Sequence, residues 1–95
     1  MNKVLHTKEA ESDLRLIYEY IKFRLHNEPA AEKLTDLFDK ETKRIQKFPT
    51  SCQAFEKYRR AVVKNYIMFY EYRERENTII VHRVMHGTRN YTEFI

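Results

Sequence analysis

The spacing of apolar side chains changes near the middle of this 95-residue chain, and that change limits the folds it can adopt. Before Pro49 the apolar residues recur every three or four positions, as on one face of a helix. From Tyr58 onward the side-chain pattern has a period of two, so that neighbouring side chains point to opposite faces, as on the pleated surface of a strand. The sequence therefore predicts an α+β fold in which an N-terminal helical hairpin packs on a small antiparallel sheet.

The first helix is predicted over residues 8–25. Thr7 is a suitable N-cap, and acidic residues follow it in the first turns, where the helix dipole favours negative charge. The apolar stripe of this helix consists of Ala10, Leu14, Ile17, Ile21 and Leu25. A short strand is expected before it, over residues 3–6.

Asn27-Glu28-Pro29 ends the first helix and supplies the entry to a second one, because Pro29 is tolerated in a first turn whose amides have no helical partner. Pro49 ends it, since a residue before proline is pushed out of the helical region. Its buried face is predicted to consist of Leu34, Leu37, Phe38, Ile45 and Phe48. The short connection makes the two helices a hairpin.

Three strands are predicted at residues 58–63, 66–73 and 78–85. A tight turn at Lys64 and Asn65 and a charged turn at residues 74–77 join them, and links this short require an antiparallel meander. Gly87 is expected to take a positive φ and to turn the chain sharply after the last strand. The predicted element order is β-α-α-β-β-β, with the helices covering one sheet face and the other face open for function.

Length and charge narrow the functional classes. We expect a single domain over residues 1–95. The 18 Lys and Arg against 14 Asp and Glu give a net charge of +4, which suits nucleic acid or an acidic protein as a partner. No run approaches the roughly 20 apolar residues of a membrane span, and Cys52, the only cysteine, cannot form an intramolecular disulfide. A cytoplasmic protein without membrane association is therefore expected.

The sequence predicts no metal and no small-molecule cofactor. His82 and His86 would lie about 13 Å apart on an extended strand, too far to share one ion. A single glycine, Gly87, excludes the glycine-rich loops that hold phosphate groups. Cys52 is interpreted as a small, partly buried apolar residue rather than as a nucleophile.

Basic and aromatic residues gather in the strand half. The basic residues are Lys57, Arg59, Arg60, Lys64, Arg83, His86 and Arg89, and the tyrosines among them are Tyr58, Tyr66, Tyr70, Tyr72 and Tyr91. This combination suits RNA, where guanidinium groups bind phosphate and rings stack on bases, and it suits protein recognition equally.

Each of these residues also has a purely structural interpretation. For the tyrosines between positions 66 and 72 we favour packing in the sheet. Arg59 and Arg60 are either a solvated pair or functional. His86 is either a hydrogen-bonded residue at a strand end or a proton-transfer group.

A set of short motifs is distributed over nearly the whole chain. They are Asp13-Leu14, Ile17 and Tyr20-Ile21, then Phe48-Pro49, then Tyr66-Ile67-Met68-Phe69-Tyr70, and finally Val81-His82-Arg83-Val84-Met85-His86-Gly87-Thr88-Arg89-Asn90. Together they resemble the RelE/ParE toxin superfamily, and the apolar strand followed by His-Gly-x-Arg is the most specific part. The resemblance implies a small bacterial toxin that a cognate antitoxin protein neutralises by wrapping around it. The antitoxin would dock on a strand edge or in the channel between the helical hairpin and the sheet.

The resemblance implies one of two activities. ParE-like members are associated with poisoning DNA gyrase, whereas RelE-like members enter the ribosome and cleave mRNA. The His-Gly-x-Arg ending and the tyrosine-rich middle strand are more similar to the ParE branch. We therefore favour a toxin that acts by binding DNA gyrase, and we keep a ribosome-dependent mRNA endonuclease as the alternative.

Only the alternative requires catalytic residues. Metal-independent RNA cleavage needs a base for the ribose 2′-hydroxyl, cations for the charged phosphorane and an acid for the leaving oxygen. The candidates are, for the cations, Arg60, Arg83 and Arg89; for the base, Glu56 or His86; and for the acid, Tyr91 or His86. RelE-like members carry several Lys and Arg on the central strands, whereas residues 66–72 include no basic residue.

Overall fold

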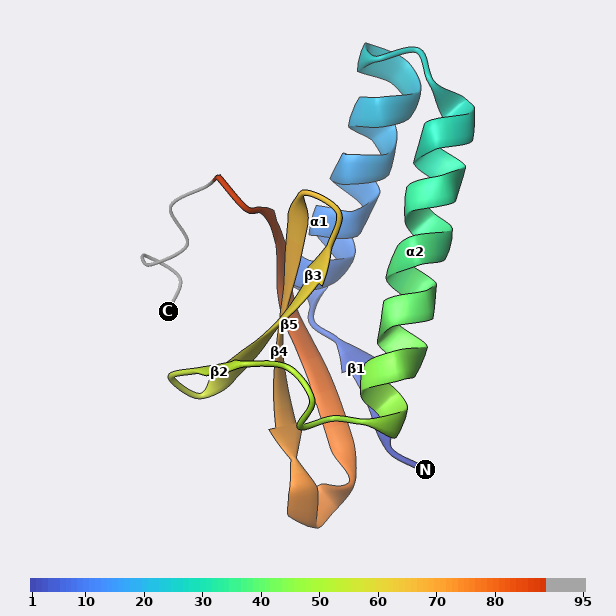
Figure 1. Cartoon of the computed structure of the whole chain (residues 1–95). Coiled ribbons are helices and arrows are strands. Elements are labelled where there is room, and N and C mark those ends of the chain that lie inside the picture. Colours follow the sequence, from blue (N-terminus) through green and yellow to red (C-terminus); the bar gives the residue numbers. More distant parts are fainter. Residues whose placement is uncertain (89–95) are drawn as a thin grey trace.

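The computed structural model describes residues 1–88, and its elements follow one another in the predicted order (Figure 1). They are β1 (Lys3–His6), α1 (Lys8–Glu19), the π-helical turn η1 (Tyr20–Arg24), α2 (Glu28–Lys47), β2 (Ala54–Phe55), β3 (Tyr58–Val63), β4 (Tyr66–Arg73), the 3-10 turn η2 (Glu74–Glu76) and β5 (Thr78–His86). The helices pair as a hairpin that packs on one face of the sheet. The predicted α+β fold is confirmed.

The five strands form one sheet in the order β1-β5-β4-β3-β2. Strands β2 to β5 pair antiparallel, which confirms the meander, whereas β1 pairs parallel with β5, so the sheet is mixed rather than purely antiparallel. Parallel neighbours need a long connection, and the chain between β1 and β5 runs through the helical hairpin and then strands β2 to β4. Hydrogen bonds from the Lys3 amide to the Asn77 carbonyl (2.7 Å) and from the Thr7 amide to the Val81 carbonyl (3.0 Å) bracket the β1–β5 pair.

The first helix begins at its predicted cap, and the second begins within the predicted Asn27-Glu28-Pro29 entry, with Asn27 as a cap that was not predicted. Thr7 Oγ1 accepts a hydrogen bond from the Ala10 amide at 3.0 Å, and Asn27 Oδ1 accepts one from the Ala30 amide at 3.1 Å. Each bond satisfies an amide that has no partner within its helix. The second helix stops at Lys47, shortly before Pro49, as the sequence predicts.

Two residues that the sequence assigns to buried helix faces are exposed instead. The wider π-turn of η1 breaks the 3.6-residue period, so Leu25 falls off the stripe and is 55% exposed. Phe48 leaves the helical conformation at the end of α2, with φ −127°, and is 59% exposed. The prediction is wrong at these positions because it assumed regular helix to both ends.

The main core lies between the hairpin and the sheet. Ile45 of α2, Tyr70 of β4 and Val81 of β5 are all fully buried there. Tyr66 and Tyr72 are partly buried and pack against the same core. Packing in the sheet, the favoured interpretation of the tyrosine stripe, is therefore confirmed.

The opposite sheet face carries a smaller apolar cluster. Tyr58, Phe69 and Met85 are buried in it, and Ile67 packs against them. We expected this face to be open for function, but its centre is apolar and buried. Charged side chains lie around that centre, and their contacts define the candidate site below.

The tight turns are made without glycine. The prediction of a positive φ at Gly87 is wrong, because no described glycine has one. Gly87 instead donates its amide to the Asn65 carbonyl at 2.7 Å, and a Cβ on it would stand 3.4 Å from that oxygen. The left-handed conformation is taken by His26, Glu56, Lys64 and Asn77.

Candidate functional site

The structure brings three of the five predicted site residues onto the same sheet. Arg60 lies on β3, and Arg83 and His86 lie on β5. Arg89 and Tyr91 lie outside the described residues.

Arg60 and Arg83 lie in one row across three strands. Arg60 pairs with Phe69 of β4, and Phe69 pairs with Arg83. The two arginine Cα atoms are therefore about 10 Å apart, two strand spacings. Their guanidinium groups are engaged by different neighbours.

Arg60 is held by the β2–β3 hairpin. Its Nη2 donates a hydrogen bond to Gln53 Oε1 at 2.9 Å, and its guanidinium lies 5.4 Å from the ring centroid of Phe55. The Arg60 amide also donates to the Gln53 carbonyl, at 3.1 Å. Stacking on an aromatic ring leaves the planar edge of a guanidinium able to make further hydrogen bonds.

Arg83 makes a bidentate ion pair with Asp13 of α1. Its Nε donates to Asp13 Oδ2 at 2.8 Å and its Nη2 donates to Oδ1 at 3.1 Å. The Val84 amide donates to the same Oδ2 at 2.9 Å, so one carboxylate binds both the side chain and the backbone of β5. The hydrogen bond to Asp13 raises the pKa of Arg83. This pair ties the first helix to the sheet at the point where β1 has ended.

His86 ends β5 and is exposed. Its Nδ1 lies 2.7 Å from Thr88 Oγ1 and accepts the Thr88 amide at 3.2 Å, and its ring meets the edge of Tyr66 with centroids 5.3 Å apart. Because Nδ1 accepts the amide proton, the neutral ring carries its hydrogen on Nε2. These contacts are typical of a hydrogen-bonded residue at a strand end. Glu56, the other candidate base, lies exposed in the turn between β2 and β3.

Sequence reasoning missed a second polar cluster around His82. The β4–β5 register shifts between Phe69 and Tyr70, so His82 is an extra, bulged residue of β5. Its Nε2 lies 3.0 Å from Glu71 Oε1, and its ring meets Tyr58 at 5.0 Å. A bulge is not visible in the sequence, because alternation does not indicate which residue of a strand is skipped.

Glu71 joins this cluster to Arg73. The Arg73 Nε donates to Glu71 Oε2 at 3.0 Å. That hydrogen bond, followed by the one to His82, holds the pKa of Glu71 below its usual value. The carboxylate therefore stays charged under acidic conditions that protonate an ordinary glutamate.

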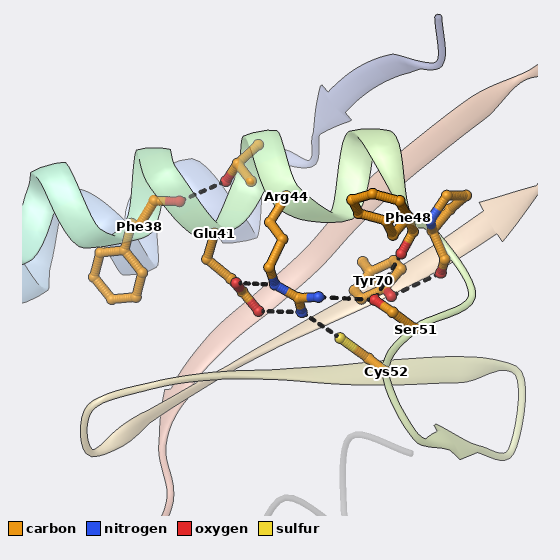
Figure 2. A network of polar contacts seen from close by, with 9 residues as sticks. Phe38, Glu41, Arg44, Phe48, Ser51, Cys52 and Tyr70 are labelled. Atoms are coloured by element: carbon orange, nitrogen blue, oxygen red, sulfur yellow. Dashed lines mark hydrogen bonds and ion pairs between the residues drawn. The ribbon is translucent and has the colours of Figure 1, made fainter.

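Arg44 of α2 organises the loop that leads into β2 (Figure 2). It donates to both oxygens of Glu41, at 2.6 and 2.8 Å, to Ser51 Oγ at 2.9 Å and to Cys52 Sγ at 3.2 Å. Tyr70 of β4 also holds this loop, because its hydroxyl donates to the Pro49 carbonyl at 2.8 Å. Cys52 is half-buried, as predicted, and its Sγ accepts a hydrogen bond from Arg44.

Arg59 holds the same loop from β3. Its Nη1 donates to the Cys52 carbonyl at 2.8 Å and to the Thr50 carbonyl at 3.4 Å. The first of these bonds is partly buried, so Arg59 is not simply one half of a solvated pair. Its role in the described structure is to cap loop carbonyls.

Within residues 1–88, no group of three His, Cys, Asp or Glu side chains is arranged to hold a metal ion. No helix in that range is both long and apolar enough to cross a lipid bilayer.

Comparison with known proteins identifies a family from the sequence, and solved structures share the fold. The sequence profile of the ParE toxin of type II toxin–antitoxin systems (parDE) matches residues 4–91. A search of curated protein sequences gave no match.

Three solved structures share the fold at low sequence identity. A chain of the chromosomal ParDE toxin–antitoxin system from P. aeruginosa matches with a TM-score of 0.75 and 16% identity, over 90% of this chain and 96% of that one. A chain of the intact E. coli RelBE toxin–antitoxin complex matches with a TM-score of 0.64 and 12% identity, over 94% and 100%. A metal-bound toxin from Helicobacter pylori matches with a TM-score of 0.51 and 18% identity, over 100% of both chains.

Proposed function

Because this chain belongs to the ParE toxin family of type II toxin–antitoxin systems, we propose that it is a toxin that acts by binding DNA gyrase, without a catalytic site of its own. It would act in the cytoplasm, where gyrase meets the chromosome, and would need no cofactor. The cationic residues of β3 and β5 would then form part of a binding surface rather than an active site.

The ion pair between Arg83 and Asp13 is the observation that carries this proposal. An arginine that stabilises a phosphorane must turn its guanidinium toward the substrate. Here Asp13 receives two hydrogen bonds from that guanidinium and a third from the Val84 amide. The pair neutralises the Arg83 charge and fixes its guanidinium against α1, and turning that group toward RNA would break bonds that hold α1 on the sheet, which supports a structural role over a catalytic one.

We further propose that a cognate antitoxin binds this chain. Two structures with the same fold come from a ParDE toxin–antitoxin system and a RelBE toxin–antitoxin complex. The net charge of +4 is compatible with an acidic antitoxin segment. We expect the isolated chain to be harder to produce than the pair.

Purified DNA gyrase tests the proposed target. The toxin should inhibit supercoiling and trap cleaved DNA, and its antitoxin, added first, should prevent both effects. Unchanged supercoiling and no trapped cleavage at high molar excess would overturn the gyrase proposal. In cells, induction should stop thymidine incorporation before leucine incorporation.

A ribosome-dependent mRNA endonuclease is the second candidate. The row that holds Arg60 and Arg83 favours it, because two guanidinium groups about two strand spacings apart suit contacts with RNA phosphates, although Phe69 between them is fully buried and offers no ring for a base. Arg60→Ala, Arg83→Ala or His86→Ala should then abolish cleavage on translating ribosomes. Absence of codon-positioned cuts by the unmodified protein would exclude this function, and early loss of leucine incorporation would support it.

A further inference from the structure

Positive charge follows one line along the second helix. Lys33, Lys40 and Lys47 of α2 recur at an interval of about two helical turns, so they share one side of the helix over a length of roughly 21 Å. Lys64, in the β3–β4 turn, lies beside this line, because it lines one hollow with Lys33 and a second with Lys40. All four residues are exposed, and together they are called the lysine stripe.

The carboxylates of α2 are engaged elsewhere. Glu32 and Asp39 line the hollow between the two helices, where the Tyr18 hydroxyl donates to Glu32 at 2.6 Å. Glu41 receives two hydrogen bonds from Arg44. The helix therefore has a basic side toward β3 and an acidic side toward α1.

The charges of the lysine stripe are not neutralised within the described part of the chain. Among residues 1–88, no ion pair includes a member of the stripe. Asp36 lies one turn from both Lys33 and Lys40 and pairs with neither. Ammonium groups gathered in this way repel one another, so a polyanion that contacts them relieves that repulsion.

From these observations we propose that the lysine stripe binds the phosphate backbone of duplex DNA. The inference goes beyond the proposed function, which requires contact with gyrase alone. It rests on that proposal only for the choice of DNA, which is the substrate of gyrase. The stripe would hold the toxin on DNA beside the enzyme.

The geometry of the stripe favours a duplex over a single strand. Successive lysines along α2 are about 10.5 Å apart, close to the ~12 Å width of the major groove, so their flexible side chains can reach phosphates on both edges. Proteins that bind single strands stack the bases on aromatic rings. The hollow beside Lys40 is instead lined by the aliphatic side chains of Leu37, Val62 and Val63. Contacts of this kind position a protein on a duplex without reading its sequence.

The salt dependence of DNA binding, measured without gyrase, tests the inference. Each phosphate contact contributes about 0.9 to the slope of log affinity against log salt for a labelled duplex of about 20 base pairs. The combined variant Lys33→Gln, Lys40→Gln and Lys47→Gln should therefore reduce the slope by about 2.7 and weaken binding at least tenfold at low salt. Fluorescence anisotropy measures both quantities.

A second triple variant is the matched control. Lys8→Gln, Arg15→Gln and Arg75→Gln remove the same charge from exposed positions on α1 and η2, and this variant should keep the slope of the unmodified chain. Equal slopes in the two triple variants would overturn the inference, because binding would then follow net charge and not the stripe. Tighter binding to single-stranded DNA, to duplex RNA or to polyglutamate would overturn the choice of duplex DNA.

Lys64→Gly separates binding from folding. The φ of Lys64 is 55°, in the left-handed region, which lysine disfavours and glycine adopts without strain. The Tm should therefore rise by about 4 °C while the salt slope falls by about 0.9. A rise in Tm with an unchanged slope would overturn the place of Lys64 in the stripe.

The outcome for DNA is distinguishable from the outcome for gyrase. No binding of the unmodified chain to the duplex would overturn this inference and leave the gyrase proposal standing. Stripe-dependent binding to DNA together with unchanged gyrase supercoiling would support the inference and contradict the proposed target.

Discussion

The two faces of the sheet differ in what buries them. The helical hairpin covers one face, and residues from both helices and four strands meet in a continuous core there. Among the described residues, the other face buries Tyr58, Phe69 and Met85, and its remaining contacts are mainly ion pairs and ring stacking. The covered face is therefore built for stability and the other face for adjustable polar contacts.

This difference explains where variation should be tolerated. Apolar burial contributes a free energy roughly proportional to area, so the covered face carries most of the folding free energy. Exposed or half-exposed ion pairs contribute little, because solvent screens them. A toxin surface that must fit a partner gains from residues whose exchange leaves the fold intact.

The largest effect is expected from a cavity in the covered face. Ile45→Ala removes a fully buried side chain of α2 and should lower the free energy of unfolding by about 3 kcal/mol. Val62→Ala is the matched change on the other face, where Val62 is 66% exposed, and should cost less than about 0.5 kcal/mol. Denaturant unfolding measures both. Equal losses would break the comparison, because they would make the two faces equally important for stability.

An intermediate effect is expected where the helices meet the open edge of β5. Asp13→Asn leaves Arg83 without its counter-charge and weakens the bond from the Val84 amide. The free energy of unfolding should therefore fall by about 2 kcal/mol. The exposed Arg15–Glu19 pair is the control, and Arg15→Gln should cost less than about 0.5 kcal/mol. Thermal and denaturant unfolding of the two variants give the comparison. If Asp13→Asn were no more costly than the control, the ion pair would not be what holds α1 to the sheet.

The fold could be predicted from the sequence wherever a period or a cap specifies it locally. The helix cap at Thr7 and the three long strands depend on neighbouring residues, and all were predicted. The parallel β1–β5 pair and the outward position of Leu25 were not. The first depends on a contact more than 70 residues apart in the chain, and the second on a π-turn that an ideal period does not include.

The candidate site was less predictable, for a related reason. Residue types indicated that Arg60, Arg83 and His86 are candidate site residues, but they did not indicate which side chains each of them contacts. Asp13 lies 70 positions from Arg83, and the contact between His82 and Glu71 depends on a bulge. Chemistry follows from residue type, whereas the pairing of charges depends on register.

The smallest effect is expected on the face away from the helices, at Glu71. Its pKa is lowered in the folded chain, first by the bond from Arg73 and then by the one to His82, so its charged form stabilises the fold. That contribution is present at neutral pH and is lost as the pH falls through the lowered pKa, because the unfolded chain then binds the proton more readily. Glu71→Gln should therefore cost less than about 1 kcal/mol at neutral pH and nothing once the carboxyl is protonated.

Stability measured against pH separates this effect from a simple loss of packing. The curves for the unmodified chain and Glu71→Gln should converge on acidification, whereas Glu74→Gln, a change in the neighbouring turn η2, should follow the unmodified chain throughout. A constant gap between the first two curves would mean that Glu71 acts through shape and not through charge. Packing rather than charge would then stabilise the face away from the helices at Glu71, as it stabilises the covered face, and the proposed difference between the two faces would be wrong.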